Sequence, residues 1–358
     1  MPTPAGLAVL AAAAVVAYLA SRLGVPLAWV LGALAVTAAG SLANVRVIAP
    51  VNGRRFGQLL VGSNIGLNMS AEAMALIAQW LPAMLATAVA AVGAAAVLSV
   101  PFARAARIDT TTAFFSLTPG GLSEMANIGH DEGARPEPIA LSQAIRVALL
   151  VCTMPPLIIA LGFDGGIPGT AAARQTLSLP DVAITLAVCL GCVAVLRLLR
   201  ANNAWMIGAL VGAGIVATTG LIEGHLPAAL FAFGQFLIGI AIGARFRRES
   251  LMRLPRVCVV VTLFIVVLAA VLLGYAALLA AVTGIDFSSA ALAASPGGLA
   301  EMSLTAQVLH LNVALVTSFH IVRSFFVNGL TQHVFRLLRR IGLFRGLEAG
   351  LDRLTGRR

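Results

Sequence analysis

The chain alternates between long apolar runs and short polar breaks, and the apolar runs have the length of membrane-spanning helices. A bilayer core requires about 20 apolar residues per spanning helix. The runs predict two successive series of six segments, at about 4–21, 26–44, 56–78, 81–103, 109–128 and 137–162, then at about 179–199, 203–222, 226–244, 257–282, 286–307 and 310–332. The pattern therefore predicts an all-α polytopic membrane protein.

The second series of segments repeats the first. TPGGLSEM at 118–125 returns as SPGGLAEM at 295–302, a displacement of 177 residues. GQLLVGSNIG at 57–66 returns as GQFLIGIAIG at the same displacement, and AWVLGAL returns as AWMIGAL at a displacement of 176. These matches predict a tandem duplication with four regions: repeat 1 at 1–162, a linker at 163–178, repeat 2 at 179–335 and a basic cytoplasmic tail at 336–358.

Arginine residues in the breaks indicate how the two repeats are oriented. In repeat 1 they follow the second and fourth segments (Arg46, Arg54, Arg55, Arg104 and Arg107). In repeat 2 they follow the first and third segments (Arg197, Arg200, Arg245, Arg247, Arg248, Arg253 and Arg256). Because basic loops face the cytoplasm, the changed parity predicts that the two repeats are inverted. Inversion requires an odd number of crossings, so one segment in each repeat must enter and leave on the same side.

The fifth segment of each repeat is the one expected to turn back. It carries Pro-Gly-Gly at its middle, and a proline there removes a backbone donor and breaks a helix. Such a re-entrant hairpin is tolerated at membrane depth where it is buried in protein or lines a wet cavity. Asp109 and Asp286 are expected to cap the first arms. The predicted architecture is two inverted repeats with about ten transmembrane helices, two re-entrant PGG hairpins and both termini in the cytoplasm.

Composition narrows the class of protein. The chain is 59% hydrophobic and 11% charged, whereas a soluble domain carries about 25% charged residues. The net charge is +10, but the arginines lie in short breaks and in the tail, where they favour contact with anionic lipid over nucleic acid. The four cysteines lie inside apolar runs and are interpreted as small packing residues.

The paired PGGLxEM motifs, at 119–125 and 296–302, resemble those of the Gram-negative AbrB-duplication membrane family, and the resemblance covers essentially the whole chain. Members of that family are described as AbrB family regulators or as ammonia monooxygenases. Neither description suits these residues. The AbrB transition-state regulator is a small soluble β-rich DNA-binding protein, and no such domain is left over here. Ammonia oxidation needs a metal site, and the five histidines show no ligand spacing.

Ionisable residues at membrane depth are the first functional candidates, because burying them is costly. Glu124 and Glu301 are expected to serve function or to pair with an arginine, and Arg146 and Arg323 are expected to bind a substrate anion or to neutralise a glutamate. Thr118, Pro119, Gly120 and Gly121, with their repeat mates Ser295, Pro296, Gly297 and Gly298, complete the predicted substrate-binding set. There, exposed N–H groups attract anions, and a plain helix break is the alternative. Accessory candidates, for which hydrogen bonding and packing are the alternative roles, are Gln58, Asn64, Gln235 and His320.

Inverted repeats with paired broken helices and midplane charges indicate a secondary transporter. We expect a small, anionic solute to cross the inner membrane, with Glu124 and Glu301 coupling protons or cations. The chain contains no GxxxxGK[ST] motif for ATP. The alternative is a membrane-embedded regulator or sensor that affects gene expression indirectly. We expect no enzyme activity, cofactor, metal or nucleic-acid partner.

Overall fold

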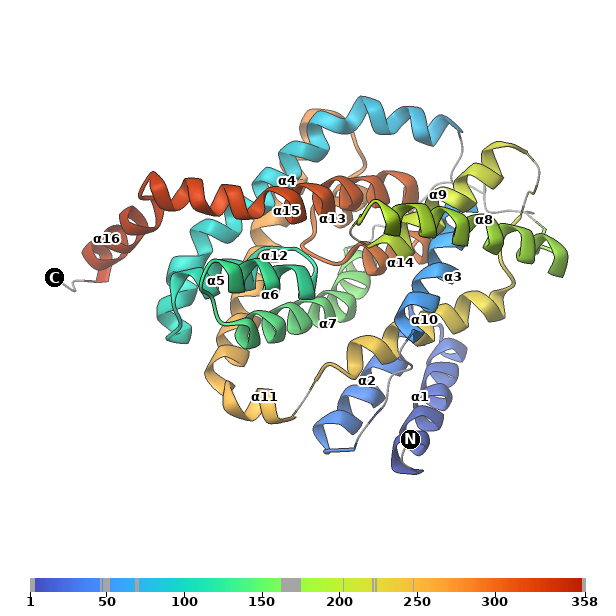
Figure 1. Ribbon diagram of the computed structural model, residues 1–358, viewed down its shortest axis with the longest axis horizontal. Coiled ribbons are helices and arrows are strands. Elements are labelled where there is room, and N and C mark those ends of the chain that lie inside the picture. Colours follow the sequence, from blue (N-terminus) through green and yellow to red (C-terminus); the bar gives the residue numbers. More distant parts are fainter. Residues whose placement is uncertain are drawn as a thin grey trace. The chain divides into compact units, whose positions relative to one another are not determined.

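The computed structural model describes residues 4–45, 47, 52–67, 71–161, 175–201, 203–220, 222, 224–246 and 248–355 (Figure 1). Within these ranges the chain is helical, apart from turns and one isolated β-bridge between Thr176 and His225. Most of the linker predicted at 163–178 lies outside the described residues.

The helices follow the two predicted series. The first series comprises α1 (Pro4–Arg22), α2 (Ala28–Leu42), α3 (Gly53–Leu67), α4 (Ala71–Ala106), α5 (Thr110–Leu117), α6 (Leu122–Asp131) and α7 (Pro136–Ala160). The second comprises α8 (Leu179–Leu198), α9 (Ala204–Thr218), α10 (Ala228–Gly243), α11 (Arg248–Arg253), α12 (Pro255–Thr283), α13 (Phe287–Ala294), α14 (Leu299–Val308), α15 (Val313–Arg340) and α16 (Leu343–Thr355). Seven helical stretches of the described chain are long and apolar enough to cross a membrane. The prediction of an all-α polytopic membrane protein is confirmed.

The prediction is wrong at the boundary between the third and fourth segments, whereas the candidate membrane span at Gln79–Ala106 agrees with the fourth segment expected at 81–103. The run expected at 56–78 ends as α3 at Leu67, and α4 continues from Ala71 to Ala106 without a stop near residue 80. Pro82 lies next to the expected boundary and lacks the backbone donor of a helical residue. A long helix tolerates that loss with a local kink, and α4 contains both Pro82 and Pro101.

The backbone repeats together with the sequence. Leu27 and Asn203, which are 176 residues apart, precede α2 and α9 with φ values of 55° and 56°. Positive φ is uncommon for residues other than glycine. Ten of the twelve described residues with positive φ form five such repeat pairs, the others being Gly24 with Arg200, Asn44 with Gly220, Arg107 with Gly284 and Gly133 with His310. The duplication is therefore a duplication of structure.

The chain forms two compact units, and each unit takes elements from both repeats. Unit 1 consists of Met1–Trp80, Val151–Arg248 and Leu299–Ser318. Unit 2 consists of Leu81–Leu150, Glu249–Gly298 and Phe319–Arg358. The units therefore do not follow the boundary between the repeats, and the division passes through α4, α7 and α15.

Unit 1 packs its helices in an order that reads the same from either end. The neighbours in sequence of contact are α1, α2, α10, α3, α9 and α8, so equivalent helices take equivalent places. At the centre, Phe56 and Phe233 are repeat mates whose ring centroids lie 6.4 Å apart. A Cβ on Gly57 would lie 2.7 Å from the carbonyl oxygen of its own repeat mate, Gly234. Such reciprocal contacts are those of a two-fold arrangement.

Unit 2 contains α12 and most of α4, which are equivalent helices of the two repeats and pack in opposite directions. Near the end of α4, the carbonyl oxygen of Ala105 accepts a hydrogen bond of 2.6 Å from Arg256 Nε at the start of α12. Further back along α4, Thr87 Oγ1 lies 3.3 Å from the hydroxyl of Tyr275 near the end of α12. A pair that matches end to start in this way is antiparallel.

The last helix of unit 2 packs onto its hydrophobic core. Phe344 of α16 lies against Phe114 of α5 and Phe335 of α15, with ring centroids 6.0 Å and 5.6 Å away. Leu347 and Leu351 join the same cluster. Residues 336–340 continue α15, and 343–355 form α16, so the described part of the predicted tail is helical.

Candidate functional site

Both PGG segments break a helix at the same place. The first break separates α5 from α6 at 118–121, and the second separates α13 from α14 at 295–298. The arms are eight and ten residues long in each copy. The predicted caps are confirmed, because Asp109 Oδ1 accepts from Thr112 N at 2.7 Å and Asp286 Oδ2 accepts from Ser289 N at 2.9 Å.

Asp286 is held as a carboxylate by the residues that it caps. The Asp286 carboxylate accepts hydrogen bonds from the Ser288 hydroxyl at 2.5 Å and from the Ser289 backbone N–H at 2.9 Å, and such bonds favour the ionised form. An ionised carboxylate at a helix N-terminus also interacts favourably with the helix dipole. The first arm of the second copy therefore begins at a charged cap.

The first copy is a hairpin whose two ends lie beside one another in unit 2. The backbone N–H of Arg135, four residues beyond α6, donates to Thr112 Oγ1 at 3.0 Å. The Arg135 guanidinium also lies 3.9 Å from the carboxylate of Asp109, at the start of α5. The chain enters at Asp109 and returns to it at Arg135, as expected for a re-entrant segment.

Each break leaves backbone carbonyls without helical partners, and an arginine in the following long helix bonds to them. Arg146 of α7 donates to the carbonyls of Thr118 and Gly120, at 3.0 Å and 2.9 Å. Arg323 of α15 donates to the carbonyls of Ser295, at 2.5 Å, and Gly297. All four carbonyls belong to repeat-equivalent positions. The forked guanidinium suits this task because it presents several donors in fixed directions.

A second side chain, one turn before each arginine, bonds to the end of the first arm. Gln143 Nε2 donates to the carbonyls of Phe115 and Thr118, both at 2.9 Å. Its repeat mate His320 bonds through Nε2 to the carbonyl of Leu292, which is the repeat mate of Phe115, at 2.9 Å. A carbonyl accepts only, so Nε2 carries the proton. These bonds satisfy backbone carbonyls at the end of the first arm, which lack intrahelical partners.

The two guanidinium groups lie at the centre of the candidate site. Arg146 is 2% exposed and Arg323 is 3% exposed. Both arginines lie in unit 2, and the charge of Arg146 acts unfavourably on that of Arg323. Arg323 forms no ion pair with any described carboxylate of unit 2, and its Nε has no hydrogen-bond partner among the described residues. The pairing with glutamate that the sequence left open for Arg323 is therefore not made there.

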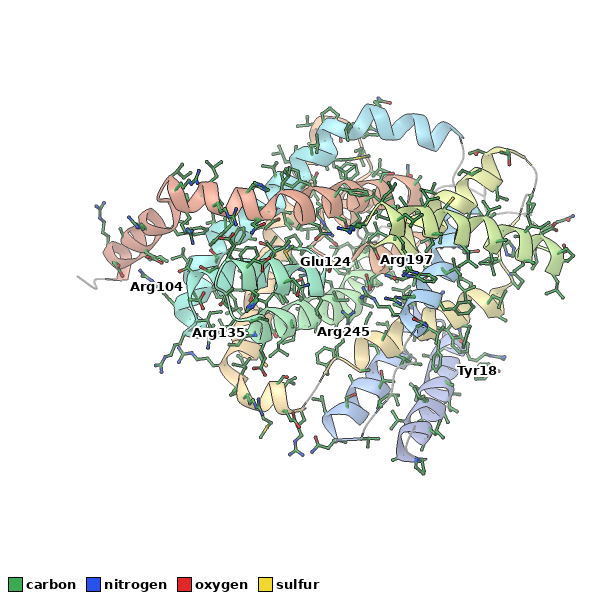
Figure 2. All side chains as sticks on the ribbon, viewed as in Figure 1. Tyr18, Arg104, Glu124, Arg135, Arg197 and Arg245 are labelled. Atoms are coloured by element: carbon green, nitrogen blue, oxygen red, sulfur yellow. The ribbon has the colours of Figure 1, made fainter. Side chains whose placement is uncertain are left out.

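The glutamates stand in the first turn of the second arms. Glu124 is half-buried on α6 (Figure 2). Its carboxylate folds back over Gly121, so that a Cβ placed there would lie 2.7 Å from Glu124 Cδ. Glu301 takes the equivalent place on α14, in unit 1, and is 6% exposed. A carboxylate in a first helical turn is favoured by the helix dipole, so the second arm of each copy begins with a favourably placed negative charge.

The accessory amides are buried in unit 1. Gln58 Nε2 donates to Asn203 Oδ1 at 3.0 Å, and Asn64 Oδ1 accepts from the backbone N–H of Leu226 at 3.1 Å. Both bonds connect different helices or a helix to a loop, which is the hydrogen-bonding role considered from the sequence. Gln235 is 6% exposed in α10. His320, in contrast, lies in unit 2, where it bonds to the carbonyl of Leu292 in the arm before the second break.

Sequence reasoning missed one member of the site. Gln143 aligns with His320 at the displacement of 177 and lies three residues before Arg146. That alignment was visible, but glutamine in a helix signals no particular partner. No group of three or more His, Cys, Asp or Glu residues that could hold a metal ion occurs within the described ranges.

Similarity to known proteins extends along almost the whole chain. A family model described as "Transition state regulatory protein AbrB" matches residues 29–339. The "Uncharacterized protein YhjN" of Bacillus subtilis is 27% identical over 359 residues, covering 90% of each chain. The "Putative regulator AbrB" of Escherichia coli is 27% identical over 306 residues, covering 84% of this chain and 86% of its own.

Proposed function

The chain belongs to the AbrB family, and from its membrane architecture and paired helix breaks we propose that it is a secondary transporter of a small anionic solute across the inner membrane. The observation that carries this proposal is the pair of buried guanidinium groups of Arg146 and Arg323, one at each break. Broken helices that meet at membrane depth are the usual place for solute binding in such carriers.

The charge of the site favours an anion. Arg146 and Arg323 are both buried, and two like charges repel in a buried site. A solute anion between them would relieve that repulsion. The Arg323 Nε–H, which lacks a partner among the described residues, is a donor available to it.

The proposal includes inverted repeats with about ten crossings and both termini in the cytoplasm. The antiparallel packing of α4 against α12 supports inversion, because these helices are repeat mates. Arg104 and Arg256 meet the same end of unit 2, where α16 also packs. The positive-inside rule assigns that end to the cytoplasm.

Glu124 and Glu301 couple solute movement to a proton or cation in this proposal. Each lies within one turn of a break, and an ionisable group at membrane depth favours a functional role. The proposal assigns no catalytic residue, cofactor, metal or nucleic-acid partner to the chain.

A membrane-embedded regulator is the second candidate, and the names of the family model and of the Escherichia coli relative favour it. Such a protein would alter gene expression indirectly and transport nothing. It would use the exposed arginines of the C-terminal segment to contact a partner.

Metabolite profiling of a deletion strain against an overexpressing strain separates the two candidates. A transporter changes the cellular level of a small anion, and the change disappears in Glu124→Gln and Glu301→Gln. A regulator changes transcripts, and this effect survives both substitutions but is lost when Arg339, Arg340, Arg345 and Arg353 are changed to Gln. Removal of α16 is a poor test, because it would expose Phe114 and Phe335.

A further inference from the structure

The C-terminal segment of unit 2 holds both arms of the first hairpin at their outer ends. Beyond the end of α6, the carboxylate of Glu132 accepts from Arg336 Nε at 2.7 Å and from Gln332 Nε2 at 2.9 Å. At the start of α5, Thr110 Oγ1 donates to Glu348 Oε1 of α16 at 3.0 Å. A displacement of α16 would therefore disturb its contact with the start of the hairpin.

The acidic groups of α16 face the protein. Arg104, at the end of α4, donates to the carbonyl of Glu348 at 2.8 Å and pairs with Asp352 at 3.0 Å. The apolar side of α16 is also occupied, because Phe344 is 7% exposed within the aromatic cluster. Because these contacts occupy the acidic and apolar sides of α16, its remaining side is exposed.

The outward side combines arginines with two large apolar side chains. Leu337 is 57% exposed and Ile341 is 65% exposed. The arginines exposed along the same stretch are Arg336, Arg339, Arg340, Arg345 and Arg353. We call these seven residues the C-terminal basic surface. Of the neighbouring carboxylates, Glu132 pairs with Arg336 of this surface, while Glu348 and Asp352 are bonded to Thr110 and Arg104.

This mixture fits the headgroup region of an anionic bilayer. Arginines near such a surface are attracted to it by about 1 kcal/mol each, while Leu337 and Ile341 can enter the boundary with the acyl chains. A free phosphate would satisfy the arginines but leave both apolar side chains in water. The lipid surface satisfies both.

We propose that the C-terminal basic surface binds anionic lipid headgroups and that this binding holds α16 on the first hairpin. The segment would then make the hairpin sensitive to the anionic lipid content of the membrane. The inference does not rest on the proposed transport function, because it concerns lipid binding alone.

Hydrogen exchange of the full chain tests the proposal in nanodiscs of phosphatidylcholine, with or without phosphatidylglycerol. Phosphatidylglycerol should slow amide exchange in 343–355 roughly tenfold. The effect should fade at about 1 M salt, where the Debye length is about 3 Å. It should be lost when Arg339, Arg340, Arg345 and Arg353 are changed to Gln, and kept in the matched control R197Q/R200Q, which changes two exposed arginines of unit 1.

Three results would overturn the proposal. Equal exchange of 343–355 in the two lipid mixtures would show that α16 does not depend on lipid charge, as expected if the surface contacts a protein instead. Slowing that survives in the four-arginine variant would place lipid binding elsewhere. Equal slowing by soluble glycerol phosphate would assign the surface to a free anion. The salt dependence of the unmodified chain keeps the test valid if the variant folds poorly.

Discussion

Arg146 and Arg323 lie 177 residues apart in the sequence and make the same pair of hydrogen bonds. Each donates from Nη1 to the carbonyl of the residue before the proline and from Nη2 to the carbonyl of the first glycine after it. The sequence suggested a substrate anion or a glutamate as their partner. The structure gives both a shared role, which is to hydrogen-bond to the carbonyls of the two helix breaks.

Replacing Arg323 by Lys should destabilise the second break. A lysine ammonium cannot reproduce the fork that reaches the carbonyls of Ser295 and Gly297. We expect the free energy of unfolding in detergent to fall by about 1–3 kcal/mol. Arg197→Lys, at an exposed end of α8, should change it little. Equal effects of the two substitutions would contradict the role given to Arg323.

Gly57→Ala should loosen the centre of unit 1. Its Cβ would meet the backbone carbonyl of Gly234 at 2.7 Å and Ile238 Cγ1 at 3.1 Å, so that α3 and α10 must move apart. We expect a loss of about 1–3 kcal/mol in unfolding free energy. Gly93→Ala in α4 meets nothing within 4 Å and should gain about 0.5–1 kcal/mol. A neutral Gly57→Ala would mean that the helices do not cross there.

Gly121→Ala should affect activity more than stability. Gly121 has a φ of −71°, which alanine adopts readily. The new Cβ would displace the Glu124 carboxylate, which is the mobile end of a flexible side chain. We expect less than about 1 kcal/mol of destabilisation, with solute flux reduced as in Glu124→Gln. In the Glu124→Gln background, Gly121→Ala should cause no further loss. Additive losses of flux in the double variant would show that Gly121 does not act through Glu124.

Much of the architecture could be predicted, because the internal repeat and the length of the apolar segments are visible in the sequence. The displacement of 177 located both breaks, and the caps at Asp109 and Asp286 followed from helix chemistry. The role of Gln143 could not be predicted, since it depends on which carbonyls the break leaves within reach. The packing of Phe344 on Phe114 could not be predicted either, because these residues of α16 and α5 lie far apart in the sequence.

The contacts of Glu132 with Gln332 and Arg336, which hold the first hairpin to α15, are sensitive to acid. Burial raises the pKa of Glu132, but hydrogen bonds from Gln332 and Arg336 and the charges of Arg336 and Arg339 outweigh burial, so that its pKa lies below the usual value. A lowered folded-state pKa stabilises the fold above the unfolded value of about 4.3, and this stabilisation is lost as the pH falls through the folded value.

The effect of Glu132 can be measured against Glu132→Gln. At pH 7 the variant should be less stable by about 1–2 kcal/mol, because a charge-assisted acceptor is replaced. The difference should shrink as the pH falls below about 4.3. A difference that stays constant down to pH 3 would exclude ionised Glu132 as its source.

Efflux from proteoliposomes tests the transport proposal most directly. Liposomes that contain the purified protein are loaded with a bacterial metabolite extract, and mass spectrometry follows which solutes leave under an imposed pH or cation gradient. The proposal predicts that one or a few small anions leave, and that Glu124→Gln and Glu301→Gln retain them. Retention of every anion by the unmodified protein, equal to that of protein-free liposomes under each gradient, would contradict it.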